Sequence, residues 1–196
     1  MNSNKYYNFA KNELFPICRS ITGKGTEQTL KKIQRFFPKL KIYKIKSGTK
    51  IFDWKIPDEW NIKNAYVIDK YQNKIIDFKK NNLHIVGYSK PIKKRLTKKE
   101  LLNKIYSLPA QPDAIPYVTS YYKKDWGFCT TDIVRKLIVK NYTKNDKFDI
   151  LIDTSFKKNG YLQYGEYFIK GKTSKEIIIS TYICHPSMAN NELSGP

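Results

Sequence analysis

The chain has 196 residues, with 37 Lys and Arg against 17 Asp and Glu, which gives a formal charge of +20. Hydrophobic residues make up 40% and aromatic residues 14%, so the chain can bury a packed core, and a wholly disordered protein is excluded. No apolar run approaches the roughly 20 residues of a membrane-spanning helix, so a membrane span is excluded as well. The amino-terminal residues lack an apolar signal segment, and we therefore expect a cytoplasmic protein.

The basic residues are spread along the whole sequence in short runs, mixed with many Asn and Ile residues. This pattern favours a solvated, lysine-coated surface and no specific nucleic-acid partner. Nucleic-acid binding would instead require lysines clustered on one face and an affinity that falls steeply with salt.

The three cysteines, Cys18, Cys129 and Cys184, include no C-x-x-C pair. An odd number of cysteines at these spacings disfavours both a disulfide framework and a zinc site built from cysteines alone. Because free cysteine is among the most buried residue types, we expect buried thiols.

The first 57 residues predict helices followed by short strands. Residues 5–15 are predicted to be helical, and residues 18–25 form a polar loop with two glycines. A second helix is expected from Thr26, an N-cap type, because apolar residues recur on one helical face until Pro38. Residues 40–45 and 51–54 are predicted as short strands.

The middle of the chain is rich in short β-like runs. The predicted strands are residues 65–69, 74–78, 83–86, 148–152 and 161–169. Thr97 and Glu100 form a capping-box pattern that opens a short helix, and several prolines then predict an irregular connection. Residues 132–139 fit either a strand or a helix.

The last predicted element, Glu176–Thr181, contains three consecutive isoleucines and is apolar on both faces. This pattern is typical of a central strand covered on both sides, which needs neighbouring strands and helices. Few residues follow it, so the sequence is expected to be the front part of a larger protein. The predicted fold class is α/β, or α+β over the whole chain.

His185 lies just beyond this predicted strand, where ligands bind in open α/β sheets. Neutral imidazole is the commonest metal-ligand type, so His185 is a candidate zinc ligand. The alternative is a structural histidine that holds a loop.

Several stretches, taken together and in order, carry a resemblance to a known family. They are residues 18–23, 47–49, 52–54, 57–62, 83–84, 88–91, 115–117, 121–122, 126–129 and 184–187. The chain resembles the N-terminal part of a bacterial aminopeptidase-like family that is related to dinuclear zinc aminopeptidases. Members of that family contain an inserted β-rich domain of unknown function.

The resemblance implies part of a phosphorylase/hydrolase-like zinc aminopeptidase fold, formed by residues 1–57 and 165–196, with residues 58–164 as the inserted domain. It implies a zinc-dependent hydrolase acting on a peptide or amide-containing small substrate. By position, His185 matches the first zinc ligand, and Asn191 falls where relatives place an aspartate that bridges both metals.

Asn191 is the main departure from the family pattern, because a neutral amide cannot bridge two cations as a carboxylate does. The catalytic base and the remaining ligands have no candidates in this sequence, so the catalytic residues stay unassigned and the chain by itself is expected to be inactive. The alternative is a non-enzymatic binding or scaffold protein associated with surface-polysaccharide biosynthesis. The oligomeric state is not predicted.

Three other groups of residues are expected to be structural. Residues 19–25 only superficially resemble a phosphate loop, since the Walker spacing is absent. Asp53, Asp58 and Glu59 are expected to form a solvated or paired acidic loop rather than a catalytic pair. The aromatic residues within 117–128 are expected to pack in the core or at its rim, with a glycan- or peptide-stacking surface as the alternative.

Overall fold

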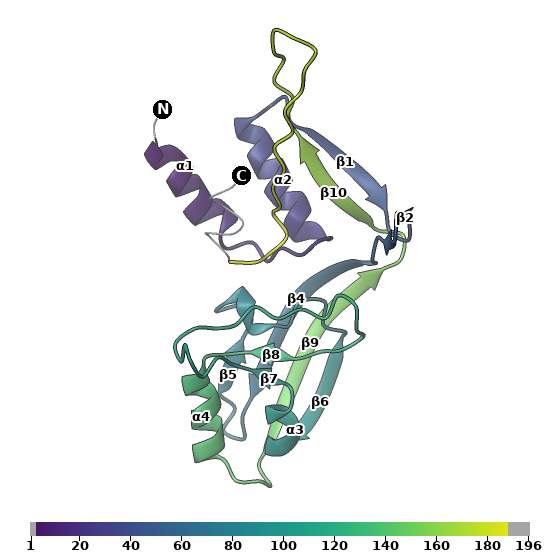
Figure 1. Ribbon diagram of the computed structural model, residues 1–196. Coiled ribbons are helices and arrows are strands. Elements are labelled where there is room, and N and C mark those ends of the chain that lie inside the picture. The colour runs from purple at the N-terminus through teal and green to yellow at the C-terminus, as the bar shows by residue number, and fades with distance from the viewer. Residues whose placement is uncertain (1–2, 188–196) are drawn as a thin grey trace. The chain divides into compact units, whose positions relative to one another are not determined.

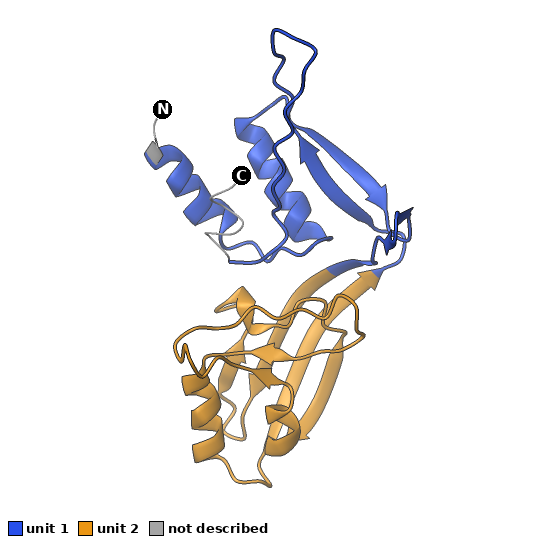
Figure 2. Ribbon diagram, viewed as in Figure 1, with its two compact units in different colours: residues 1–60, 157–196 blue, residues 61–156 orange. Residues whose placement is uncertain are grey.

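Residues 3–187 are described by a computed structural model, which shows a mixed α/β fold with several small sheets (Figure 1). The chain divides into unit 1, residues 1–60 and 157–196, and unit 2, residues 61–156 (Figure 2). The boundaries expected from the sequence lie near residues 57 and 165. Two long strands, β4 (Glu59–Ile68) and β9 (Lys147–Lys157), each run through one of the unit boundaries.

The helices of unit 1 are α1 (Ser3–Phe9), continued by a π-helical turn over Ala10–Leu14, and α2 (Lys24–Phe36). Glu13 joins the two segments through ion pairs with Lys32 and Arg35 of α2. The predicted N-cap of α2 is wrong, because Gly23 precedes the helix in place of Thr26. Gly23 has a φ of 97°, a backbone conformation that glycine adopts without steric cost.

The strands of unit 1 form two small antiparallel sheets. β1 (Lys41–Lys46) pairs with β10 (Tyr161–Glu166), and β2 (Lys50–Ile51) pairs with β3 (Trp54–Lys55). Helix α2 packs on β10, where a Cβ added to Gly165 would lie 3.0 Å from Cδ2 of Leu30. A side chain at position 165 would therefore push against the helix.

Unit 2 is built on a four-stranded sheet with the order β5-β4-β9-β6, in which β5 is Lys74–Asp77 and β6 is Ile92–Thr97. Along β9 the buried residues alternate, with Phe148, Ile150 and Ile152 on one face. This period of two is what a half-buried strand requires. A second, parallel pair joins β7 (Ile105–Tyr106) to β8 (Phe128–Cys129).

Two helices and the β7–β8 pair supply the rest of the unit 2 core. Helix α3 (Lys98–Leu102) begins with the predicted Thr97–Glu100 capping box, and α4 (Asp132–Asn141) begins after Thr131, whose hydroxyl accepts from Val134 N. This cap resolves the strand-or-helix ambiguity at residues 132–139. The segment predicted as a strand at 83–86 overlaps instead with a 3₁₀ turn, Asn82–His84. The core cluster comprises Ala65, Val67, Ile76, Ile85, Leu96, Leu101, Ile105, Phe128, Ile138, Phe148, Ile150 and Ile152.

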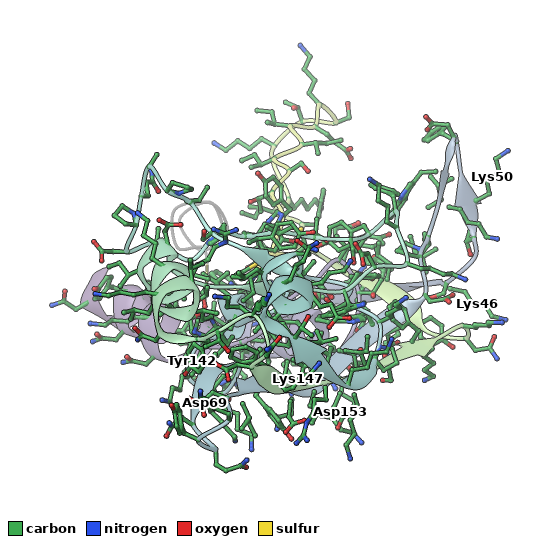
Figure 3. All side chains as sticks on the ribbon, turned by 90° about the horizontal axis from the view of Figure 1, so that it is seen from below. Lys46, Lys50, Asp69, Tyr142, Lys147 and Asp153 are labelled. Atoms are coloured by element: carbon green, nitrogen blue, oxygen red, sulfur yellow. The ribbon has the colours of Figure 1, made fainter. Side chains whose placement is uncertain are left out.

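A polar contact joins the residue after α4 to the residue after β4. The Tyr142 hydroxyl donates to Asp69 Oδ2 at 2.7 Å, and the two side chains lie together in Figure 3. Asp69 also accepts from the backbone N–H groups of Tyr71 and Asn73, each at 2.8 Å. Although burial raises the pKa of Asp69, these hydrogen bonds outweigh it and lower the pKa below its ordinary value.

The predicted strand at Glu176–Thr181 is wrong for this structure. The segment forms neither a strand nor a helix, and the side chains of its three isoleucines are exposed. A strand that is apolar on both faces needs partners on both edges and covering layers on both faces. Within residues 3–187 no strand pairs with this segment, so it lacks those partners here.

Candidate functional site

The loop between the two helices of unit 1 is organised by Arg19, which is only 1% exposed. Its Nη1 donates to the carbonyl oxygen of Leu14 at 2.6 Å, and its Nε donates to the carbonyl oxygen of His185 at 2.9 Å. Hydrogen bonds from a buried charged group are stronger than neutral ones. Arg19 therefore ties the backbone at His185 to the end of the first helical segment.

The same loop uses its hydroxyl groups to hold its own backbone. Ser20 donates to the carbonyl oxygen of Thr22, and Thr26 donates to the carbonyl oxygen of Ser20. At Gly25 an added Cβ would lie 2.0 Å from the carbonyl oxygen of Cys18, so only glycine fits. These contacts support the structural interpretation of residues 19–25 over phosphate binding.

His185 is half-buried, close to the end of the described part of the chain. Its ring packs against Tyr182 in a T-shaped arrangement with centroids 5.7 Å apart, and its Nδ1 lies 3.8 Å from Sγ of Cys184. Ser187 Oγ donates to the carbonyl oxygen of Phe15 at 3.4 Å. The histidine thus belongs to a segment that two hydrogen bonds tie to the first helical region and the loop after it.

The described residues do not complete a metal site. Residues 3–187 contain no group of three His, Cys, Asp or Glu side chains that could hold a metal ion. Asn191, the second predicted ligand, lies outside the described residues. His185 therefore stands in the structure as a candidate ligand whose partners would have to come from elsewhere.

The acidic residues near the tryptophans have structural contacts. Glu59 Oε2 accepts from the backbone N–H of Tyr161 at 3.2 Å, and the Asp58 carbonyl oxygen accepts from the Thr22 hydroxyl at 3.4 Å. Asp53 is exposed in the turn between β2 and β3. These positions support the prediction of an acidic loop with a structural role.

The thiols and the second histidine also have structural environments. None of the three cysteines forms a disulfide within residues 3–187, and burial raises the pKa of both Cys18 and Cys129 to about 12. Neither of these two thiols is then a nucleophile near neutral pH, because the reactive species is the thiolate. His84 Nδ1 donates to the carbonyl oxygen of Cys129 at 2.7 Å, and burial lowers the pKa of this histidine.

Aromatic residues of the loop before β8 contact other tyrosines or the unit 2 core, against which Trp126 packs. Tyr88 makes a T-shaped contact with Tyr121 at 4.7 Å, and the hydroxyls of Tyr117 and Tyr121 lie 2.8 Å apart. Phe128 is fully buried, whereas Tyr122 is exposed. This arrangement supports the packing interpretation over a stacking surface for a glycan.

A groove of about 500 Å³ lies within unit 1, between α2, β10 and residues 179–184. Its lining is mostly apolar and includes Leu30, Ile33, Phe37 and Tyr167. Cys184, the neighbour of His185, also lines it. The groove therefore connects the histidine segment with the apolar side of α2.

The positive charge is divided equally between the two units. Unit 1 has 18 Lys and Arg against 8 Asp and Glu, and unit 2 has 19 against 9, so each carries +10. The positive charge is therefore not concentrated in one unit, which agrees with the prediction of a lysine-coated surface. The absence of a specific nucleic-acid partner stays a prediction. Within residues 3–187 no helix has the length and apolar character to cross a membrane.

Comparison with known proteins places the chain in a family. Residues 7–196 match the model of the domain of unknown function DUF4910, and the chain belongs to this family. The resemblance to aminopeptidase-like proteins is supported by the names of two relatives, while the dinuclear zinc site and the inserted domain stay predictions.

The two relatives come from Clostridium acetobutylicum. One, named "Putative polysaccharide biosynthesis protein with aminopeptidase-like domain", is 49% identical over 183 residues, which are 93% of this chain and 41% of the relative. The other is a crystal structure of a "putative peptidase", with 47% identity and a TM-score of 0.90 over 98% of this chain and 44% of that one. The chain thus spans less than half the length of either relative.

Sequence reasoning identified His185 but missed the role of Arg19. An arginine between a cysteine and a serine gives no periodic signal, and two of its partners are carbonyl oxygens 5 and 166 residues away. The only signal was its place within the 18–23 stretch of the family resemblance. Every residue has a main-chain carbonyl oxygen, so the sequence does not indicate which of them accept a hydrogen bond from Arg19. This contact could therefore be found only in the three-dimensional structure.

Proposed function

We propose that this chain contributes part of the active site of a zinc-dependent, aminopeptidase-like hydrolase that cleaves a peptide or another amide bond. The observation that carries the proposal is the 49% identity over 183 residues to a relative named for an aminopeptidase-like domain. The related protein of known crystal structure is called a "putative peptidase", which supports the same class of reaction. The fold proposed for the complete protein is that of the zinc aminopeptidases, with residues 58–164 as an insertion.

In this proposal His185 is a zinc ligand and Asn191 occupies the neighbouring ligand position. Bound zinc would supply a Lewis acid and an activated water molecule. The role of Arg19 is to position the histidine loop, because its Nε holds the carbonyl oxygen of His185 at 2.9 Å. The remaining ligands and the general base would come from outside residues 3–187, so the chain alone is expected to be inactive.

A second candidate is a non-enzymatic scaffold in polysaccharide biosynthesis, a process that appears in the name of the relative. Two observations favour it: residues 3–187 contain no group of three metal-ligating side chains, and unit 2 has a closed core of its own. In this case His185 would only stabilise the loop that Arg19 holds.

The zinc content of the full chain separates the two candidates. Purified protein would be dialysed against a zinc buffer and analysed by atomic absorption, alongside His185→Ala. The matched control is His84→Gln, because His84 is the only other histidine and glutamine can still donate to the Cys129 carbonyl. Because this chain supplies only part of the ligand set, we expect weak binding, with more zinc bound at the same free concentration by the wild type and His84→Gln than by His185→Ala.

A companion variant, Asn191→Asp, tests the second ligand position. A carboxylate would bind zinc more tightly than a neutral amide, so the affinity should rise only if position 191 lies beside the metal. Equal zinc retention by the wild type and His185→Ala, or none by either, would rule out the metal proposal and leave the scaffold.

A further inference from the structure

Helix α4 of unit 2 presents aliphatic side chains to water on the face that turns away from the core. Its core face is formed by Val134 and Ile138 and continues to Tyr142 beyond the helix. The other face consists of four exposed residues at helical spacing, namely Ile133, Lys136, Leu137 and Lys140. Because positions i, i+3, i+4 and i+7 lie on one side of a helix, these four residues form a single surface.

The exposed aliphatic residues belong to a unit that forms a core of its own. All of unit 2, residues 61–156, is described, and its core cluster of twelve residues lies wholly within it. Ile133 and Leu137 stay outside this cluster, with 45% and 48% of their surface exposed. Val139, on the same helix, is 47% exposed. The fold of unit 2 thus accounts for the core face of α4 and leaves its outer face without a structural role.

The turn between β4 and β5 lies beside the C-terminal end of α4 (Figure 1). The hydrogen bond from Tyr142 to Asp69 and an ion pair of 3.0 Å between Lys70 and Asp146 join the two regions. At the tip of the turn Tyr71 is 65% exposed, and Nζ of Lys70 lies 5.0 Å from the centroid of its ring. An exposed aromatic residue next to a lysine therefore lies near the end of the α4 surface.

The charge of this region is positive, because the nearby carboxylates are already engaged. Asp132 pairs with Lys136 at 2.9 Å, and Asp146 pairs with Lys70. Lys140 and Lys144 are exposed beyond these pairs. Unit 2 as a whole carries +10, and 17 of its 19 basic residues are lysines. A partner of this surface must therefore be anionic.

The mixture of aliphatic residues and lysines distinguishes between kinds of anionic partner. Lysine is depleted in protein–protein interfaces, and its compact ammonium group is strongly hydrated. On a helix that lies in a membrane interface, aliphatic residues reach the boundary of the acyl chains while lysines extend to the lipid phosphates. Tyrosine, with an apolar ring and a polar hydroxyl, is enriched at the same depth. The surface of α4 combines these three residue types.

We propose that α4 and the β4–β5 turn form a peripheral docking surface for an anionic phospholipid bilayer. Ile133 and Leu137 enter the boundary between headgroups and acyl chains, and Lys140 and Lys144 bind lipid phosphates. Tyr71 lies at the level of the headgroups. The contact is reversible, since one short helix buries little apolar surface, and it depends on neither zinc nor catalysis.

The test is sedimentation of the full 196-residue chain with lipid vesicles. One set of vesicles is phosphatidylcholine alone, and the other contains about one third phosphatidylglycerol, an anionic lipid. We expect the chain to bind the anionic vesicles and to bind the neutral ones much more weakly, with an affinity that falls as salt is raised. His185→Ala should bind like the wild type, which separates this proposal from the zinc proposal.

Two lysine pairs separate a local surface from the net charge of the chain. The double variant Lys140→Gln, Lys144→Gln should weaken binding to anionic vesicles about tenfold. The matched control is Lys123→Gln, Lys124→Gln, which removes the same charge from two exposed lysines in the loop before β8. The control should retain nearly all of the wild-type affinity.

A second comparison tests the apolar part of the surface. Leu137→Ser should weaken vesicle binding about fivefold, because less apolar surface enters the bilayer. Tyr71→Ser should also weaken it, whereas Tyr122→Ser, which alters an 85% exposed tyrosine in the loop before β8, should not. Since all these side chains are exposed, the urea unfolding midpoints should stay close to that of the wild type.

Three results would overturn the proposal. The first is equal binding to neutral and anionic vesicles, or none to either. The second is equal weakening by the two lysine pairs, which would assign binding to net charge. The third is binding that depends on Lys140 and Lys144 but not on Leu137, which would assign the surface to a soluble polyanion such as a nucleic acid.

Discussion

The two units of this protein, coloured separately in Figure 2, differ in where their apolar residues lie. Unit 2 buries twelve hydrophobic residues in one cluster between its four-stranded sheet, its two helices and the β7–β8 pair. In unit 1 the buried hydrophobic residues are few, namely Leu14, Leu30, Ile56 and Trp60 among those described, while aromatic and isoleucine side chains near and after β10 stay exposed. Unit 2 therefore has an apolar core of its own, whereas the described residues of unit 1 bury few apolar side chains.

Polar contacts compensate in unit 1 for the small apolar core. Arg19 joins Leu14 to His185, and Glu13 joins the first helical region to α2. Hydrogen bonds of this kind are directional and define a geometry, which non-directional apolar burial does not. The difference between the units is that unit 2 is held mainly by buried apolar side chains, whereas the described part of unit 1 depends more on polar contacts.

The largest expected effect is that of Phe148→Ala in unit 2. Phe148 is completely buried and packs against Tyr142 with ring centroids 4.9 Å apart. The cavity should destabilise unit 2 by about 3–5 kcal/mol. Hydrogen exchange measured by mass spectrometry should show faster exchange over residues 61–156.

The matched variant in unit 1 is Ile178→Ala, which removes apolar surface that is already in water. Its effect on the isolated chain should be less than about 0.5 kcal/mol. If both variants destabilised the chain equally, the contrast between the two units would be wrong, and residues 176–181 would have to be buried in solution.

The second prediction concerns the tightly packed loop of unit 1. Gly25→Ala places a Cβ 2.0 Å from the carbonyl oxygen of Cys18, so the loop backbone must shift. We expect a loss of about 1–3 kcal/mol, as for other overpacked sites, measured by urea unfolding. Gly171→Ala is the control, because its added Cβ would meet nothing within 4 Å. Equal midpoints for the two variants would contradict the tight packing of residues 18–25.

Much of unit 2 could be predicted from the sequence because its signals are local. The capping box at Thr97 and Glu100, and the alternation of Phe148, Ile150 and Ile152, depend on neighbours within a few residues. The ambiguity at residues 132–139 had a local solution as well, since the Thr131 hydroxyl caps α4. Local patterns suffice where a unit supplies its own core.

Most of the wrong predictions lie in unit 1, where contacts between residues far apart in the sequence determine the local structure. Glu176–Thr181 has the composition of a central strand, but no strand among residues 3–187 pairs with it. Thr26 has the residue type of an N-cap, yet its hydroxyl bonds to Ser20 in the preceding loop. His185 could be identified from the sequence as a candidate zinc ligand. The contact between Arg19 and its carbonyl oxygen could not, because the two residues are 166 positions apart.

The smallest expected effect tests the polar edge of unit 2, through Tyr142→Phe. Burial, and then the hydrogen bond to Asp69, raise the pKa of Tyr142 to about 12, above the value of about 10 for an unfolded tyrosine. A raised pKa means that the neutral hydroxyl stabilises the fold fully below about pH 10 and progressively loses this effect as the pH rises to about 12.

The variant should therefore cost about 1 kcal/mol at neutral pH, and its difference in unfolding free energy from the wild type should shrink as the pH rises through that window. Urea unfolding of both proteins across this range measures the difference, with the exposed Tyr122→Phe as a control that should show none. A variant as stable as the wild type at neutral pH would mean that Tyr142 contributes only the packing of its ring against Phe148, which phenylalanine keeps.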